Sequence, residues 1–183
     1  QLPFHRLLPP RINEPTLRIM SFNIWSGSRR EETANVIRAN HWPDIVAIQE
    51  LTPTMATLID EAVGEQYPFR ILDFKDGRVG LGIYSCYPLQ ELNPEIGSDS
   101  NWQVQVVQVQ MPDRAFVLYN VHPYATNVYL YLEQGLSLSK AVRTSYANRL
   151  TFVKRLLDDI RQRDTPVIVA GDLNSTEQSD VYK

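Results

Sequence analysis

Residues 166–174 read PVIVAGDLN and join an apolar run to a polar end. The run after the proline is rich in β-branched residues and predicts a buried strand. It ends at Gly171, Asp172 and Asn174. A buried carboxylate without compensation is very unfavourable, so Asp172 must be paired, hydrogen-bonded or bound to a metal. Because open sheets keep their sites at strand ends, this stretch indicates a functional site.

Composition limits the classes of protein that fit. The chain has 183 residues, 43% of them hydrophobic, which suits one domain with a substantial core. Its net charge of −3 and its pI near 5.6 lack the basic character of a tight, non-specific nucleic-acid binder. The single cysteine, Cys86, excludes an intramolecular disulfide and a cysteine-rich zinc site.

The domain boundary follows from a change in composition. Residues 1–15 are rich in proline and read as a linker, and residues 16–183 read as one domain. No stretch approaches the roughly 20 apolar residues of a membrane span, and no signal peptide is evident. Two localisations stay open: membrane association through a segment preceding Gln1, or the cytoplasm.

The first part of the domain alternates strands and helices. Thr52 followed by Pro53 is typical of a helix start, and Ser28 with Glu31 fits a capping box. The expected strands cover residues 16–25 and 44–51, and the expected helices cover residues 29–40 and 53–66. Two strand–helix units in a row predict a layered α/β structure.

The middle part reads as an antiparallel meander followed by a helix and the last strand. Its expected strands cover residues 67–75, 79–89, 101–111 and 114–124, and its expected helix covers residues 141–163. In WQVQVVQVQ the apolar phase changes from even to odd positions, which predicts a β-bulge near Val106. The Tyr-rich residues 124–131 could stack on bases, touch lipid or pack on the core, and packing is the favoured interpretation.

Polar side chains recur at the ends of several expected strands. They are Asn23, Glu50, His122, Asp172 and Asn174, with Asn120 and Gln49 beside them. If the strands are neighbours, these groups converge on one place.

Each of these residues also has a local interpretation. Asn23 alone is typical of a turn or bulge, and Glu50 alone could favour the dipole of the following helix. His122 alone fits a strand end. Asp172 alone fits an Asx-type turn in which Gly171 supplies a positive φ. The recurrence at successive strand ends favours a shared site.

Oxygen ligands without cysteine favour a hard cation, Mg²⁺ or Mn²⁺, over zinc. One carboxylate with amide and water ligands leaves coordination positions for phosphate oxygens. Such a cation would stabilise charge that develops on a phosphoryl group.

The segments LRIMSFNIW, DIVAIQE, VLYNVHP and PVIVAGDLN, in this order, resemble the endonuclease/exonuclease/phosphatase superfamily, the DNase I-like fold. The resemblance runs from about residue 16 to residue 175. It implies a mixed α/β (α+β) fold, a four-layer α/β/β/α sandwich. It also implies hydrolysis of phosphate esters that depends on a divalent metal, with water attacking a metal-bound phosphate.

The resemblance also implies residue roles. Glu50 would be the metal ligand, with Asn23 beside it at the metal and phosphate. His122 would contact the scissile phosphate, Asp172 would position the attacking water, and Asn174 would help to hold the phosphate. Arg149 is a weaker candidate for the phosphate, since it also fits a solvated helix cation.

One departure from the family concerns the end of the chain. Members continue past the GDxN motif to a terminal SDH motif, and none of His5, His41 and His122 stands in that context. The chain is therefore expected to be the N-terminal two-thirds of a domain. We expect its 183 residues to have little activity and to self-associate through exposed sheet edges. The Pro-rich start resembles the linker of bacterial members that are tethered by membrane helices.

Several readings of function remain. The leading one is a metal-dependent phosphodiesterase or phosphatase whose partner is a phosphate-ester substrate: nucleic acid, a lipid headgroup or a small phosphoester. No obligate protein partner is inferred. The alternative is an inactive binding or scaffold module that keeps the fold. A Ser-His-Asp hydrolase is excluded because the sequence has no G-x-S-x-G elbow.

Overall fold

The structure is a computed structural model that describes residues 16–25, 30–74, 80–94, 96, 102–123 and 128–175. The order of elements is β1 (Ile19–Asn23), α1 (Arg30–Ala39), β2 (Ile45–Leu51), α2 (Pro53–Val63), the 3-10 turn η2 (Gly64–Gln66), β3 (Phe69–Asp73), β4 (Gly80–Ser85), β5 (Leu89–Leu92), β6 (Trp102–Gln110), β7 (Ala115–Pro123), α3 (Val128–Glu133), α4 (Leu138–Arg161) and β8 (Val167–Gly171).

The first sheet has the strand order β1-β2-β4-β3. Strands β1 and β2 are parallel, because α1 returns the chain to the same end of the sheet. Strand β4 is antiparallel to both of its neighbours, β2 and β3. The two predicted strand–helix units are therefore confirmed.

Helix α2 begins as its sequence predicts. Thr52 is the N-cap and accepts a hydrogen bond from the Met55 backbone N–H at 3.2 Å, and Pro53 is the first helical residue. The buried face of the helix, which includes Met55, Ile59 and Val63, packs on the outer face of the first sheet. The capping box predicted at Ser28 and Glu31 lies outside the residues whose side chains are described.

The second sheet has the strand order β5-β6-β7-β8. Strands β5, β6 and β7 form an antiparallel meander, and β8 pairs in parallel with β7 after the crossover through α4. Phe152 and Leu156 of α4 pack on the outer face of this sheet against Val117, Tyr119 and Val121.

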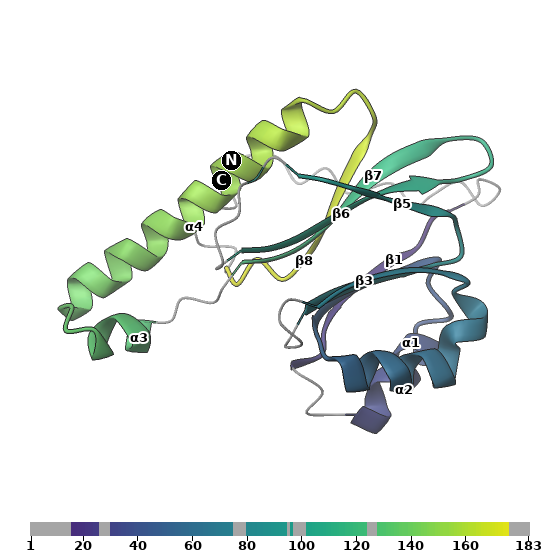
Figure 1. Cartoon of the computed structure of the whole chain (residues 1–183), viewed down its shortest axis with the longest axis horizontal. Helices are drawn as coiled ribbons and strands as arrows, with labels where there is room; N and C mark the ends of the chain where they lie inside the picture. The colour runs from purple at the N-terminus through teal and green to yellow at the C-terminus, as the bar shows by residue number, and fades with distance from the viewer. Residues whose placement is uncertain are drawn as a thin grey trace.

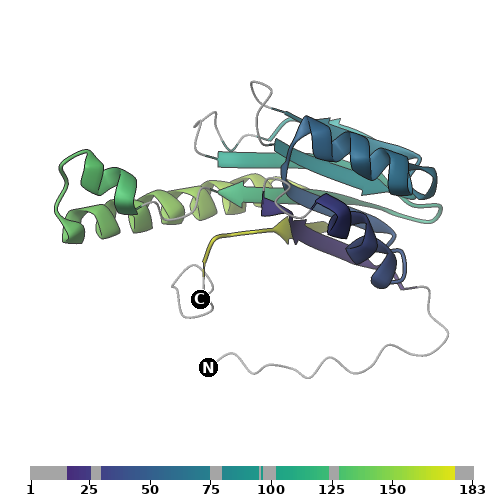
Figure 2. The ribbon, with the colours of Figure 1, turned by 90° about the horizontal axis from the view of Figure 1, so that it is seen from below.

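The elements stack in four layers (Figure 1). Helices α1 and α2 cover one sheet, α4 covers the other, and the two sheets face each other across a core that contains Ile45, Ile83 and Leu118. Seen from below, the first half of α4 projects with α3 beyond the sheets (Figure 2). The predicted α/β/β/α sandwich is confirmed.

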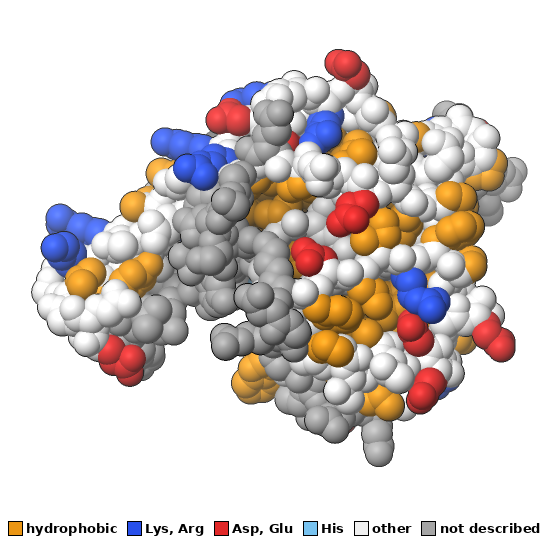
Figure 3. Space-filling view, in the orientation of Figure 1, with side chains coloured by type: hydrophobic (Ala, Val, Ile, Leu, Met, Phe, Trp, Pro, Cys, Tyr) orange, Lys and Arg blue, Asp and Glu red, His pale blue; other side chains and the backbone are white. Residues whose placement is uncertain are grey.

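Charge is unevenly distributed over one face of the molecule. In the view of Figure 3, Lys and Arg side chains lie mainly along α4, whereas acidic side chains are spread over the sandwich. No helix in the described part of the chain combines the length and the apolar character needed to cross a membrane.

The β-bulge predicted near Val106 is wrong. Strand β6 pairs with β7 in unbroken register from Trp102 to Gln110. Val106 packs toward α4, whereas Val107 and Val109 pack toward the other sheet. The change of apolar phase therefore arises because both faces of the strand are buried, not because a residue is inserted.

Two other expectations needed correction. The segment expected as one strand over 79–89 divides at residues 86–88, and its two parts, β4 and β5, belong to different sheets. The predicted single meander is thus shared between two sheets. Part of the Tyr-rich segment forms the short helix α3, and residues 124–127 lie outside the described part.

Candidate active site

The side-chain amide of Asn23 joins two carboxylates that are far apart in sequence. Its Nδ2 donates to Glu50 Oε1 at 3.1 Å and to Asp172 Oδ2 at 3.1 Å. Since both oxygens lie at this distance from one nitrogen, they are separated by no more than twice that distance. Glu50 belongs to the first sheet and Asp172 follows the second, so the two sheets meet at this point.

Three site residues reach this place by strand periodicity. Side chains two residues apart share one face of a strand. On β1, β7 and β8 the inner face carries Ile19, Leu118 and Ile168, all of which pack between the sheets. Continuing each series by two residues at a time gives Asn23, His122 and Asp172. The polar groups therefore occupy one end of the layer between the sheets.

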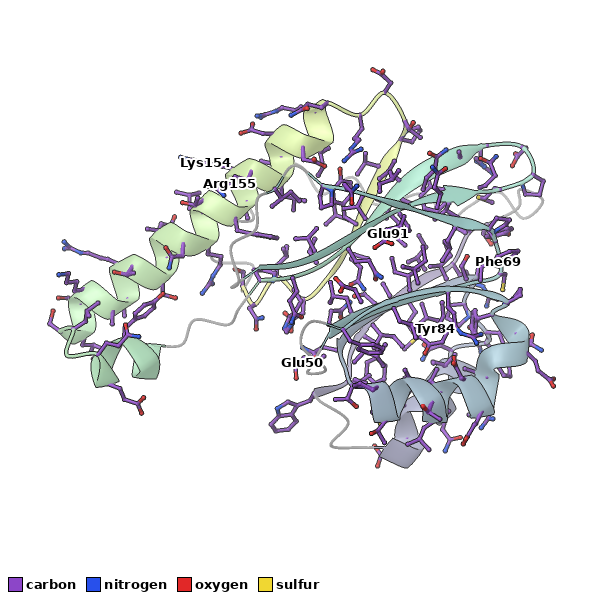
Figure 4. The ribbon with its side chains drawn as sticks, in the orientation of Figure 1. Glu50, Phe69, Tyr84, Glu91, Lys154 and Arg155 are labelled. Carbon is purple, nitrogen blue, oxygen red and sulfur yellow. The ribbon has the colours of Figure 1, made fainter. Side chains whose placement is uncertain are left out.

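Glu50 reaches the same place through a backbone irregularity. In plain alternation Glu50 would face away from the layer that holds Gln49. The β2–β4 register shifts between Gln49 and Leu51, and Glu50 has a φ of +57°. This irregularity turns the carboxylate toward Asn23, and 21% of the side chain stays exposed. Figure 4 shows Glu50 at the end of the first sheet.

The turn after β8 holds Asp172 and Asn174. The Asp172 backbone N–H extends the ladder by donating to the Val121 carbonyl at 3.0 Å. Asp172 Oδ1 accepts from the Asn174 backbone N–H at 2.8 Å, which is an Asx-type turn. The Asn174 amide donates to the Pro123 carbonyl at 2.9 Å and so ties this turn to the end of β7.

His122 lies between the first sheet and its own strand partner. Its Nε2 is 3.7 Å from Glu50 Oε1, and its Nδ1 is 3.4 Å from Gln103 Oε1. Only 13% of the side chain is exposed. The Glu50 contact is an ion pair whenever the imidazole is protonated. Gln103 was not predicted as a site residue; its alternating position on β6 opposite His122 is the signal that could have indicated it.

Arg149 lies near the turn rather than free in solvent. Its guanidinium donates from Nη1 to Ser175 Oγ at 3.0 Å, one residue beyond Asn174. The side chain is half-buried. The structure thus brings Arg149 to the edge of the group formed by Asn23, Glu50, His122, Asp172 and Asn174.

These residues make the local hydrogen bonds expected of turns and also converge on one site. Asn23 Oδ1 accepts from the Trp25 backbone N–H at 2.9 Å, as in a turn, while the nitrogen of the same amide faces the carboxylates. Asp172 makes its Asx-type bond with one oxygen and meets Asn23 with the other. Local hydrogen bonds therefore orient the groups that converge.

The donor set suits a hard divalent cation. The Glu50 carboxylate, with the Asn23 amide beside it, is the kind of ligand that Mg²⁺ takes with water and phosphate oxygens. In the part of the chain that the structure describes, no three His, Cys, Asp or Glu side chains form a metal-binding cluster. Asn23 Oδ1, the amide atom that can bind a cation, accepts from the Trp25 backbone N–H with one of its two lone pairs.

The family of the chain follows from its sequence profile. The profile of the Endonuclease/Exonuclease/phosphatase family matches residues 20–183. The chain belongs to this family. The predicted resemblance is confirmed, and the matched region contains every predicted site residue. No curated protein sequence is significantly similar to the chain.

Solved structures share the fold at low sequence identity. A humanized TDP2 of D. rerio, altered by 14 mutations, has a TM-score of 0.65 and 20% identity over 87% of this chain and 63% of its own. A truncated Caenorhabditis elegans TDP2 has a TM-score of 0.68 and 17% identity over 88% and 64%. Sphingomyelinase C from Streptomyces griseocarneus has a TM-score of 0.64 and 18% identity over 92% and 68%. The chain thus spans less than two-thirds of the length of the two TDP2 structures.

Proposed function

We propose that the protein hydrolyses phosphate esters with the help of a divalent cation, Mg²⁺ or Mn²⁺. The observation that carries this proposal is the double hydrogen bond of Asn23 to Glu50 and Asp172. It gathers two carboxylates from the two sheets beside His122. Membership of a family named for nucleases and phosphatases supports the same reaction class.

Each site residue has a role in the proposed reaction that follows from the chemistry of its side chain. Asp172 is a carboxylate that can orient a water molecule and accept its proton while the water oxygen bonds to phosphorus. His122 can donate a hydrogen bond to a phosphate oxygen as the ester P–O bond breaks. Asn174 lies beside Asp172 and would help to hold the phosphate.

Glu50 would hold the cation, with Asn23 beside it. When bound, the cation would supply a positive charge that stabilises the negative charge developing on the phosphoryl group. Without a cation, the Asn23 amide donates to both carboxylates and holds them near one another. This arrangement reduces their mutual repulsion.

A cation titration tests the site. Mg²⁺ or Mn²⁺ should raise the melting temperature of the chain, by the equivalent of about 2.7 kcal/mol when the cation is at 100 times its Kd. Glu50→Gln should remove the rise. Glu61→Gln is a matched control, because Glu61 is exposed on α2. An unchanged response of Glu50→Gln would place the cation elsewhere.

A turnover assay tests the reaction. Asp172→Asn should lower kcat by roughly 10²–10⁴-fold, since the amide cannot take a proton, while cation binding at Glu50 persists. The assay should use the 183-residue chain with and without the cation. Cation binding without turnover would favour the alternative of a binding module.

The substrate within the class needs a direct comparison. Among the similar structures, one D. rerio TDP2 is complexed with a single-strand DNA product, and another is a sphingomyelinase C. A panel of single-stranded DNA, RNA, sphingomyelin, inositol phosphates and simple phosphomonoesters and phosphodiesters separates the options. The preferred substrate is the one with the highest metal-dependent kcat/KM that also falls in Asp172→Asn.

A further inference from the structure

Two buried amides join the sheets directly beneath the candidate site. Gln49 on β2 and Asn120 on β7 are 1% and 0% exposed. Gln49 Nε2 donates to Asn120 Oδ1 at 2.7 Å, which is a bond between side chains of the two sheets.

The Asn120 amide is bonded further into the first sheet. Its Nδ2 donates to the Ile48 carbonyl at 3.1 Å and to the Gly82 carbonyl at 3.2 Å. Asn120 is therefore hydrogen-bonded to the backbones of β2 and β4 as well as to the Gln49 side chain. Gln105 adds a parallel link, from its Nε2 to the Ile71 carbonyl of β3 at 2.9 Å.

Amides at this place need a physical explanation, because the core cluster between the sheets is formed mainly by apolar side chains. A buried amide loses its hydrogen bonds to water, and only well-formed hydrogen bonds within the protein compensate for that loss. A hydrogen bond between side chains of the two sheets is directional, and a fully satisfied buried polar network makes a core rigid and unique. Buried polar groups are known to specify register in other systems.

The hydrogen bond between Gln49 and Asn120 lies close to four of the candidate site residues. Gln49 precedes Glu50 and is the register partner of Asn23. Asn120 lies two residues before His122 on the same face of β7, and its register partner Ala170 lies two residues before Asp172. Glu50 and His122 lie within two residues of the pair along the chain, Asn23 lies across one strand pairing, and Asp172 lies across one pairing and two residues further.

We propose that Gln49 and Asn120 are positioning residues, whose hydrogen bond sets the distance between the sheets at the site. They touch neither cation nor substrate, and they act through Glu50, Asn23, His122 and Asp172. The expected effect on cation binding and turnover rests on the proposed function. A site shared by two sheets is sensitive to the distance between them. A misplacement of about 1 Å can cost on the order of 10²-fold in rate.

The test compares the loss of stability with the loss of site geometry. Gln49→Ala and Asn120→Ala are set beside Ile45→Ala, which empties space in the same layer at the opposite end of β2. Ile45→Ala should destabilise the fold, but it removes no link between the sheets near the site. The first readout is the Kd for Mn²⁺, measured from the electron paramagnetic resonance signal of free Mn²⁺. The measurement is made under conditions in which all variants are folded.

We expect the Gln49 and Asn120 variants to weaken Mn²⁺ binding by about 10–100-fold, as for groups that orient metal ligands. Ile45→Ala should stay within about twofold of the wild type. The proposal is overturned if Ile45→Ala weakens binding as much, or if the amide variants bind Mn²⁺ normally. The paired exchange Gln49→Asn with Asn120→Gln, which can rebuild the bond, should restore binding relative to Gln49→Asn alone.

A second readout decides the proposal without the cation. In the NMR spectrum of the metal-free chain, the Asn23 side-chain amide signals should shift in Gln49→Ala and Asn120→Ala but not in Ile45→Ala. Absence of Mn²⁺ binding by the wild type would count against the proposed function, and these signals would still test the positioning role. Unshifted Asn23 signals in both amide variants would overturn that role. If an alanine variant does not fold, Gln49→Asn replaces it.

Discussion

Gly171 controls the geometry of the turn that carries Asp172. Its φ is +140°, and a Cβ at this position would lie 2.0 Å from the Val121 carbonyl oxygen. Gly171→Ala should therefore destabilise the fold by about 3 kcal/mol or more, since backbone strain and a clash with a paired strand add together. Urea denaturation of the variant measures this loss.

Gly135→Ala is the matched control for strain without a clash. Gly135 has a φ of +82°, and a Cβ there would meet nothing within 4 Å. It should cost only about 1 kcal/mol. Equal losses at the two glycines would show that the close approach of β7 to Gly171 is not important.

A second prediction at this scale concerns alkaline pH. Burial, and then the hydrogen bond to the Asp159 carboxylate, raise the pKa of the Tyr119 hydroxyl from 10.0 to about 12. Above pH 10 the unfolded chain loses the Tyr119 proton while the folded chain keeps it. The free energy of unfolding should be unaffected by this group below pH 10 and should fall between pH 10 and 12.

Tyr119→Phe tests this pH dependence. The variant should show a smaller decrease between pH 9 and pH 11.5 in urea denaturation than the wild type. Part of the decrease will remain, because the pKa of Tyr67 is also raised to about 12, mainly by burial. An identical slope in the variant would contradict the raised pKa of Tyr119.

The site residues could be predicted individually because each ends an apolar strand. The amide pair beneath them could not, although Gln49 and Asn120 stand in the same segments. An amide inside a strand is compatible with either face until the neighbouring strand is known. The bond between them depends on how the two sheets face each other, which no local pattern specifies.

Among the elements, β6 shows how a correct pattern can be misinterpreted. Its consecutive valines, Val106 and Val107, are both buried, one toward α4 and one toward the other sheet. Alternation predicts strand faces only when one face meets solvent. A strand in the middle of a four-layer sandwich has no face that meets solvent. The change of apolar phase was therefore interpreted as a bulge, although it reflects burial of the second face.

The two-sided burial of β6 gives a prediction. Val106→Ala and Val107→Ala should each destabilise the fold by about 2 kcal/mol, because each leaves a cavity in a different core. Gln90→Ala on the exposed face of β5 should change the stability little. A large loss at only one of the valines would contradict burial on both sides.

The helices were predicted with unequal success for a physical reason. Helix α4 has apolar residues at helical spacing over many turns, which gives a strong signal. Helix α3 has six residues, and helices this short depend on tertiary packing rather than on their own propensity. It is linked to α4 by the Asn148 side chain, which donates to the Tyr131 hydroxyl at 2.9 Å.

At the scale of the whole molecule, the strand order was beyond local patterns. Strand β4 lies between β2 and β3, and β5 crosses to the other sheet after residues 86–88. The β2–β4 pairing joins segments distant in sequence, and the family resemblance implied the layers without a strand order. The four layers followed from that resemblance, and the element order alone indicated only a mixed α/β protein.

The edge of the second sheet gives a prediction about assembly. Strand β8 is an edge strand in the described part of the chain, and Val169 on it is 42% exposed. Exposed apolar edges promote pairing between copies. The 183-residue chain should show a concentration-dependent rise in mass by size-exclusion chromatography with light scattering. Val169→Lys should reduce this rise, and an unchanged mass distribution would place the contact elsewhere.

The most direct measurement of the central claim is Mn²⁺ broadening in the NMR spectrum of the ¹⁵N-labelled chain. If residues of both sheets share one cation site, the amide signals of Asn23, His122 and Asn174 should broaden together at the same low Mn²⁺ concentration. The same signals should stay sharp in Glu50→Gln. Broadening confined to one sheet, or unchanged in Glu50→Gln, would contradict the shared site.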